Sequence, residues 1–267
     1  MRNKQKSYAG SICIIHLNVN FSCTQIKTIL DLPVGRNLQD KYGSLIGPFY
    51  VDPGKSFLMP RDMTPSSFVE YFTAGTGVFT STRLEGTYTL RSSIAKREAN
   101  KYPDLFTYIL AHSTDEFFER DMGTAINMKT SILRSYYNMW EGRDSFFQLV
   151  TVPKPFSTGV LELKDTDPKS HPLLDPKYLS DQRDVDVLVE GIKFAVDLVE
   201  KTKSFQSING QMLPIPFPGC EHLKFKSDEY WECFARHTTA TAYKYCSTVP
   251  MGKDGNDPIA VVDSFLR

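Results

Sequence analysis

The sequence lacks both an excess of charge of one sign and a long apolar run. Lys plus Arg number 31 and Asp plus Glu number 31, so the formal net charge is zero. Nucleic acids and anionic membrane surfaces attract proteins with an excess of positive charge, and this composition gives no electrostatic case for either partner. No stretch approaches the roughly 20 apolar residues that cross a bilayer. We therefore expect a soluble protein with no membrane span and no nucleic-acid partner.

Cysteine is sparse, and its spacing gives no metal motif. The sequence has 5 cysteines, namely Cys13, Cys23, Cys220, Cys233 and Cys246. No C-x-x-C pair and no Cys/His cluster has the spacing of zinc ligands, so we expect no metal site. The odd count argues against a fully disulfide-bonded scaffold but leaves one or two bridges open.

The N-terminal stretch lacks a convincing signal peptide. Residues 1–23 begin with basic side chains, but the apolar run that follows, residues 9–17, is short and is interrupted by Ser11 and His16. A secretory signal needs a longer uninterrupted apolar region. Secretion stays open, and the sequence does not choose a compartment.

Motifs that bind phosphate or activate a serine nucleophile are also absent. The sequence contains no G-x-G-x-x-G, no G-x-x-x-x-G-K-[ST] and no G-x-S-x-G pattern. Gly75 and Gly77 form a G-T-G, but they lie in a Gly/Thr/Ser-rich loop with no preceding strand, whereas a dinucleotide site needs a strand, a Gly-rich turn and a helix start. The motifs therefore predict no standard dinucleotide site.

Hydrophobic periodicity predicts a mixed fold. Residues 105–110 and 146–152 have the pattern of strands, and residues 184–201 have apolar side chains at helical spacing, with Asp181 as N-cap. A second helix is expected after Ser227. We expect two further features: a short helix capped by Thr64, and a core face of the second helix formed by Tyr230, Trp231, Phe234 and Ala235. Residues 114–137 give no clear signal.

Several separate segments resemble one enzyme family in that family's order. They are DLPVGRNLQD (31–40), the segment 159–186 with the pattern D-P-x-x-H-P-x-x-D-P-x-Y-L-S-D-x-x-D-V, PGCE (218–221), YWEC (230–233) and the C-terminal segment 237–267. Together they are similar to the C-terminal half of the glucose–methanol–choline (GMC) flavin oxidoreductases, and in particular to insect glucose dehydrogenase (FAD, quinone)-like proteins.

The resemblance implies both a fold and an activity. The fold is an α+β substrate domain with a mainly antiparallel sheet flanked by helices, lacking the N-terminal FAD-binding Rossmann-like half. We expect residues 1–43 to be an unrecognised N-terminus with a remnant of the flavin-binding portion, and residues 44–267 to be the substrate domain, with the C-terminal signature at 151–267. The family's activity is FAD-dependent oxidation of an alcohol (CH–OH donor) by hydride transfer to the flavin.

The resemblance also points to site residues. The family's segment has T-x-Y-H before a turn and M-G, and in this sequence Lys244 stands where the family has its first active-site histidine. A neutral imidazole takes the hydroxyl proton readily near pH 7, whereas a lysine is a base only when burial depresses its pKa. Lys244 is therefore either a doubtful catalytic residue or a charged side chain at a vacated site. Asn37 and Asp40 lie in the segment expected near the flavin, where they either contact it or shape a turn. The family's second catalytic position lies beyond Arg267.

Other side chains have plain structural interpretations beside functional ones. His237 either faces the flavin pocket or is a polar surface or capping residue, and His171 is expected in a turn. Cys246 would need a lowered thiol pKa to be reactive. The aromatic residues between 49 and 147 either line a substrate pocket or pack in the core, and packing is the default.

Two functional hypotheses follow. In the first, the chain is part of an FAD-dependent alcohol oxidoreductase, and alone it binds FAD poorly or not at all and is inactive. In the second, it is a degenerate, non-catalytic paralogue that binds a small molecule. The sequence identifies neither the alcohol, the electron acceptor, the substrate-pocket residues nor the oligomeric state.

Overall fold

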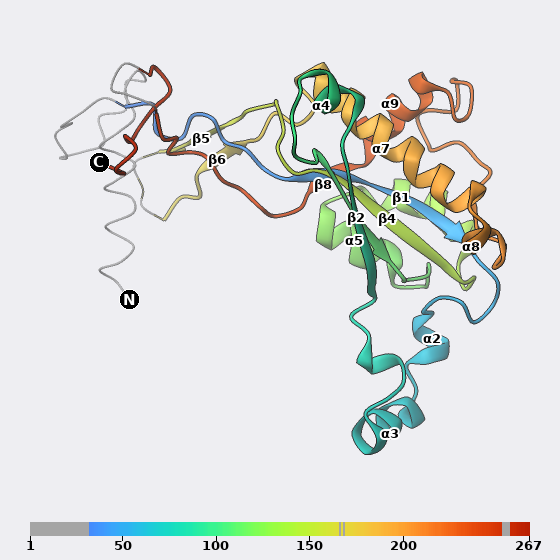
Figure 1. Cartoon of the computed structure of the whole chain (residues 1–267). Helices are drawn as coiled ribbons and strands as arrows, with labels where there is room; N and C mark the ends of the chain where they lie inside the picture. The colour runs from blue at the N-terminus through green and yellow to red at the C-terminus, as the bar shows by residue number, and fades with distance from the viewer. Residues whose placement is uncertain (1–31, 166, 168, 253–256) are drawn as a thin grey trace. The chain divides into compact units, whose positions relative to one another are not determined.

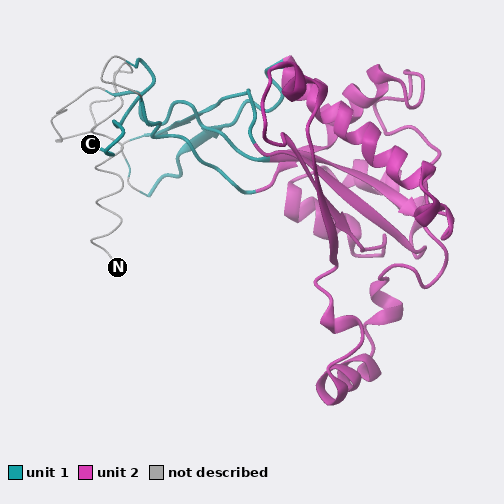
Figure 2. Ribbon diagram, viewed as in Figure 1, with its two compact units in different colours: residues 1–41, 154–181, 243–267 teal, residues 42–153, 182–242 magenta. Residues whose placement is uncertain are grey.

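The computed structural model describes residues 32–165, 167, 169–252 and 257–267. The chain divides into two compact units (Figure 2): unit 1 comprises residues 1–41, 154–181 and 243–267, and unit 2 comprises residues 42–153 and 182–242. The N-terminal features noted in the sequence, including the basic start, Cys13, Cys23 and Asp31, lie outside the described residues. The domain boundary predicted at residue 43 remains a prediction.

Unit 2 is built on an antiparallel sheet. Its strands are β1 (Tyr42–Tyr50), β2 (Leu84–Leu90), β3 (Leu105–Leu110), β4 (Ser145–Val152), β7 (Gln211–Met212) and β8 (Thr239–Thr241). The strand order is β2-β3-β4-β1-β7, and β8 also pairs with β1. Every pairing is antiparallel. The α+β class is thereby confirmed, as are the two predicted strands.

The sequence of the central strand, β1, does not have the pattern of a strand. Its residues, YGSLIGPFY, include Gly43, Gly47 and Pro48, which normally indicate a turn. The register with β4 shifts between Ile46 and Phe49, so the Gly-Pro pair lies in an irregularity where the ladder is interrupted. Proline in a sheet is tolerated at such irregularities because no ladder hydrogen bond is needed there. All nine residues of β1 are buried, and pairing on both sides outweighs the poor local propensity.

Helices such as α7 and α5 flank this sheet, whereas α2 and α3 project away from it (Figure 1). In chain order, the helices of unit 2 are α2 (Met59–Asp62), α3 (Pro65–Ala74), α4 (Ser93–Arg97), α5 (Phe118–Ile126), α6 (Thr130–Tyr137), α7 (Gln182–Lys201), α8 (Lys203–Gln206) and α9 (Asp228–Thr238), with 3-10 turns η1 (Val78–Thr80) and η2 (Asn138–Trp140). Within the described residues, no helix combines the length and apolarity needed to cross a membrane. The helices α5 and α6 occupy the region that the sequence left unassigned.

The helix α7 confirms the strongest periodic signal in the sequence. Its buried face includes Val185, Leu188, Ile192 and Val199, and apolar residues at this spacing form one stripe on a helix. The stripe lies against the sheet, where the backbone of Gly191 approaches the side chains of Val150 and Leu105. Burial of this stripe fixes α7 on the sheet.

Two predicted helix starts are confirmed by their caps. The Ser227 hydroxyl accepts a hydrogen bond from the Tyr230 amide at 3.2 Å at the start of α9, and the Thr64 hydroxyl accepts one from the Ser67 amide at 3.2 Å at the start of α3. The predicted core face of α9 is buried. The apolar residues of α3 are not: Phe72 is 78% exposed. Helical spacing therefore predicted α3, although this helix has no buried residue.

Unit 1 contains short pieces of extended chain. The strands β5 (Val160–Glu162) and β6 (Leu173–Asp175) pair antiparallel. Isolated bridges join Leu38 to Gly159 and Gln39 to Cys246. Residues 33–36 form a turn, in which the Arg36 amide donates to the Pro33 carbonyl at 3.1 Å. Segments far apart in the sequence thus meet in this unit.

The close approach of α7 to the sheet gives a test of unit 2. A Cβ on Gly191 would lie 2.7 Å from Val150 Cγ1 and 2.8 Å from Leu105 Cδ2. We expect Gly191→Ala to lower the free energy of unfolding by about 1 kcal/mol, because overpacking of about 1–3 kcal/mol exceeds the gain of up to about 1 kcal/mol from helix propensity. Urea denaturation measures this change.

A glycine of the sheet of unit 2, Gly86, serves as the control. A Cβ on Gly86 in β2 would lie 3.6 Å from Ile109 Cδ1, an ordinary contact. Gly86→Ala should therefore leave stability unchanged or raise it slightly, since alanine loses less backbone entropy than glycine in a strand. Equal stability changes for the two variants would contradict the packing argument.

Candidate functional site

Two segments of unit 1 lie side by side and contain all three predicted site residues. Gln39 and Cys246 exchange backbone hydrogen bonds of 3.0 and 2.8 Å. The Asn37 side-chain amide donates to the Ser247 carbonyl at 3.3 Å, and Asn37 itself has a left-handed backbone, with φ 59°. The fold therefore brings Asn37, Asp40 and Lys244 together, although Lys244 is about 200 residues further along the chain.

Asp40 is the organising side chain of this arrangement. It is 2% exposed. One carboxylate oxygen, Oδ1, accepts a hydrogen bond from the Lys244 backbone amide at 2.9 Å, and the other, Oδ2, accepts one from the Tyr178 hydroxyl at 2.5 Å. Hydrogen bonds to a carboxylate are stronger than those between neutral groups. Asp40 thus ties the segments around residues 178 and 244 to its own segment.

The backbone amide of Lys244 is held by Asp40, whereas its side chain extends from an exposed position. The residue is exposed, and its ammonium group forms no ion pair with a carboxylate of the described residues. Removal from water is the usual way in which a protein turns a lysine into a base, and the surroundings of Lys244 supply little of it. The segment keeps its conformation through the main chain, independently of the side chain at position 244.

Comparison with known proteins places this segment in a family. Residues 155–267 match the family model described as GMC oxidoreductase. The chain is 39% identical over 116 residues to a glucose dehydrogenase [FAD, quinone] of Drosophila pseudoobscura pseudoobscura, a match that covers 43% of this chain and 18% of that protein. It is 26% identical over 245 residues to the glucose dehydrogenase [FAD, quinone] of Drosophila melanogaster, covering 91% of this chain and 36% of that protein. The C-terminal part of the chain, residues 155–267, is therefore similar to the GMC oxidoreductases.

A solved structure agrees with the fold of this chain. A crystal structure of formate oxidase superposes with a TM-score of 0.66 at 19% identity, covering 98% of this chain and 45% of that chain. Identity this low supports the shared fold alone. The chain spans about a third of the length of the Drosophila melanogaster relative. The correspondence of Lys244 to the family's histidine, and of Asn37 and Asp40 to a flavin contact, remains a prediction.

Among the described residues, neither the G-T-G at Gly75 nor the Asp40 carboxylate is placed to hold FAD. A pyrophosphate binds where backbone amides at a helix N-terminus point toward it. Gly75, the first glycine of the G-T-G, instead caps the C-terminus of α3, and its amide donates to the Tyr71 carbonyl. The C-terminal end of a helix dipole repels anions. Both oxygens of Asp40 are already engaged as acceptors, so this carboxylate offers no free group to a flavin.

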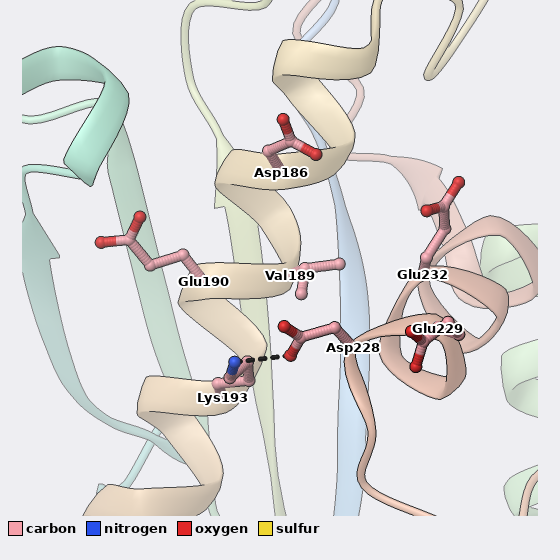
Figure 3. Close-up of a pocket in the computed structure, with 7 residues that line it drawn as sticks. All are labelled: Asp186, Val189, Glu190, Lys193, Asp228, Glu229 and Glu232. Atoms are coloured by element: carbon pink, nitrogen blue, oxygen red, sulfur yellow. Dashed lines mark hydrogen bonds and ion pairs between the residues drawn. The ribbon is translucent and has the colours of Figure 1, made fainter. Parts of the chain in front are cut away.

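A recess of ≈ 460 Å³ lies between α7 and α9 in unit 2. Its lining is mostly acidic, with Asp186, Glu190, Asp228, Glu229 and Glu232 around Val189 and Lys193 (Figure 3). Three of these acids are already paired: Asp228 with Lys193 at 2.6 Å, Glu190 with the Ser93 amide and Glu232 with Arg236. An acidic, internally paired surface gives no reason to expect a ligand here.

A second recess, of ≈ 570 Å³, lies at the end of β1. The rings of Tyr50 and Trp140 lie 4.8 Å apart in its wall, and Arg143 lies over the Trp140 ring at 4.6 Å. Burial raises the pKa of Tyr50 far above its usual range, so its hydroxyl stays protonated. Other aromatic side chains between residues 49 and 147 pack in the core instead, including Phe49, Tyr136, Tyr137, Phe146 and Phe147.

The structure brings together a Cys/His cluster that the sequence spacing did not reveal. Cys220 and Cys233 form a disulfide, and His237 lies beside it. Sequence spacing did not reveal the cluster because Cys233 and His237 are one helical turn apart, whereas Cys220 arrives from a loop 13 residues upstream of Cys233. The C-x3-H spacing on the α9 pattern was the signal that could have revealed it. His171, expected in a turn, lies in an irregular segment directly after one.

Proposed function

We propose that this chain is the substrate-domain half of an FAD-dependent GMC oxidoreductase that oxidises an alcohol. The observation that carries the proposal is the family match over residues 155–267, which includes the segment around Lys244. The relatives named glucose dehydrogenase [FAD, quinone] support FAD as the cofactor. Bound FAD would supply the hydride acceptor for a CH–OH donor.

The second part of the proposal is that the polypeptide of residues 1–267 neither retains FAD nor oxidises alcohols. Its described residues form no pyrophosphate cradle, and its G-T-G lies at the wrong end of a helix. Lys244 is exposed, and it stands where the resemblance places the family's first active-site histidine. The role of Asp40 is then to hold the segment 243–246 in place, rather than to contact a cofactor.

Purification tests both parts. We expect the polypeptide, purified in the presence of added FAD and then desalted, to show no flavin absorbance in the visible range. Lys244→His should behave in the same way and should not reduce a dye acceptor with glucose or a small primary alcohol. A stoichiometric yellow flavin, or alcohol-dependent dye reduction by the Lys244→His protein, would overturn the proposal.

A second function is favoured by Lys244 itself. A non-catalytic paralogue that binds a small molecule would not need histidine at this position, and the segment keeps its fold through the Lys244 main chain. Transcript sequencing distinguishes the two. A continuous transcript that encodes a Gly-rich dinucleotide motif upstream of Met1 supports the enzyme, whereas an expressed transcript with a stop codon directly after Arg267 and no such motif supports the paralogue.

A further inference from the structure

Cys220, Cys233 and His237 form a compact cluster in unit 2. Cys233 and His237 lie one turn apart on α9, and Cys220 lies in the loop that precedes this helix. The two cysteines are joined as a disulfide, with Cα atoms 6.0 Å apart. The sulfur atoms and one imidazole nitrogen all lie within 4.8 Å of one another. These are the ligand types that zinc prefers.

The distances between the imidazole nitrogen and the two sulfurs already match those between neighbouring ligand atoms of one metal ion. His237 Nδ1 is 3.8 Å from Cys220 Sγ and 3.7 Å from Cys233 Sγ. In a tetrahedral zinc site with Zn–S of about 2.3 Å and Zn–N of about 2.0–2.1 Å, neighbouring ligand atoms are roughly 3.5–3.8 Å apart. The two sulfurs are now bonded to each other. Once they separate, all three distances between ligand atoms match those of a tetrahedral site.

The surroundings hold the cluster in place and leave one side open. Cys220 is fully buried, whereas His237 is exposed. Gly219, with φ +94°, lets the backbone pass beside the ring: a Cβ there would lie 3.1 Å from His237 Nε2. His237 Nδ1 lies 2.9 Å from the Cys233 carbonyl oxygen, so in the disulfide form its N–H donates a hydrogen bond to that oxygen. Metal binding would replace that proton.

We propose that reduction of the Cys220–Cys233 disulfide creates a Zn²⁺ site formed by the two thiolates and His237 Nδ1. A dithiol reductant transfers two electrons and two protons to the disulfide, whose S–S bond breaks to give two thiols, and the reductant leaves as its own cyclic disulfide. Zn²⁺ then displaces the two thiol protons and the Nδ1 proton, with Nε2 taking up a proton from solvent to keep the imidazole neutral. Water occupies the fourth position on the exposed side, as in zinc sites with three protein ligands.

The site goes beyond the proposed function and does not depend on it. None of Asn37, Asp40 and Lys244 belongs to the cluster, and both the cluster and its supporting loop lie in unit 2. Metal or disulfide would each join α9 to the loop before it, so the chain keeps a cross-link at this point in both redox states.

Cobalt spectroscopy on the full chain tests the site. In a background with Cys13, Cys23 and Cys246 replaced by serine, the protein is reduced with dithiothreitol, desalted without oxygen and titrated with Co²⁺. We expect one equivalent to bind, with a thiolate-to-cobalt charge-transfer band and the intense visible bands of tetrahedral coordination, and Zn²⁺ should bleach both. The oxidised protein should show neither band.

Two histidine variants separate ligation from general surface binding. His237→Gln should weaken Co²⁺ binding by at least about tenfold, since even the loss of a residue that only supports a ligand costs about that much. His222→Gln, at an exposed position on the same loop, should leave binding unchanged. Circular dichroism of each reduced variant shows whether it is folded.

Three results would overturn the proposal. One is equal Co²⁺ binding by the oxidised and reduced proteins, and another is unchanged affinity in a folded His237→Gln variant. The third is a reduced, folded protein whose bound cobalt lacks the charge-transfer band, because that band requires thiolate ligands. Cys220→Ser gives an internal check, since the charge-transfer intensity should fall or disappear while His222→Gln retains it.

Discussion

Replacing Asp40 with alanine should release the segment around Lys244 and speed amide hydrogen exchange at Gln39 and Cys246 about a hundredfold. The Asp40 carboxylate is buried and accepts hydrogen bonds from the Lys244 amide and the Tyr178 hydroxyl. A hydrogen bond to a charged group contributes about 1.5–3 kcal/mol, and the loss of both should cost about 3 kcal/mol locally. Each 1.4 kcal/mol is a factor of ten in an equilibrium constant, which gives the hundredfold change. Exchange measured by mass spectrometry on peptides that span 36–42 and 243–248 reports it.

Two controls distinguish a local tie from a general loss of stability. Tyr178→Phe removes one of the two hydrogen bonds and should raise exchange about tenfold. Exchange in α9, which lies in unit 2, should stay unchanged in both variants. If Asp40→Ala left the exchange of Cys246 within about threefold of the unmodified protein, less than 1 kcal/mol by the same conversion, Asp40 would not be the organising residue.

This expectation assigns a structural role to a residue of a recognisable motif. Asp40 ends the segment DLPVGRNLQD, and Tyr178 lies in the second segment that indicated the family. The two are 138 residues apart and meet through one hydrogen bond. Motif residues that identify a family therefore include those that hold its segments together, and their presence does not by itself establish catalysis.

Elements with strong local patterns were predictable, and those stabilised by distant partners were not. The helix α7 has apolar residues at helical spacing over its length, and the strands β3 and β4 are short runs rich in apolar and β-branched residues. By contrast, β1 carries turn-forming residues and is a strand because β4 pairs along one side of it, with β7 and β8 on the other. The apolar stripes of helices α5 and α6 are short and interrupted, so the sequence did not predict these helices. Their position depends on distant contacts, since Phe118 and Tyr137 pack on Phe147.

The candidate site was predictable only where the family pattern supplied it. The family pattern selected Lys244, Asn37 and Asp40, and the structure brings their segments together. The Cys220, Cys233 and His237 cluster was not predicted, because its spacing matches no local motif and its assembly depends on how the loop before α9 folds. A cluster formed by a loop residue and two helix residues can be recognised only when the positions of the loop and the helix are known.

Replacing Asp184 with alanine should lower the free energy of unfolding of unit 2 by about 3 kcal/mol. Asp184 is fully buried in the first turn of α7, and its carboxylate accepts a hydrogen bond from the Tyr42 hydroxyl of β1 at 2.9 Å. The substitution leaves a buried hydroxyl without this acceptor and opens a small cavity, and both effects are costly. The negative charge at the start of the helix is lost as well. Urea denaturation in a Trp140→Phe background follows unit 2 through Trp231, the remaining tryptophan.

A double-mutant cycle with Tyr42→Phe decides whether the hydrogen bond itself carries the effect. Tyr42→Phe alone should cost about 2 kcal/mol, because it deprives a buried carboxylate of a donor. If the two side chains act through their mutual hydrogen bond, the double variant should be scarcely less stable than Asp184→Ala alone, since contacting residues are not additive. Additive losses would instead show that Asp184 stabilises α7 through other contacts. In that case, this acidic residue of the family pattern would serve the helix start rather than the attachment of α7 to the central strand.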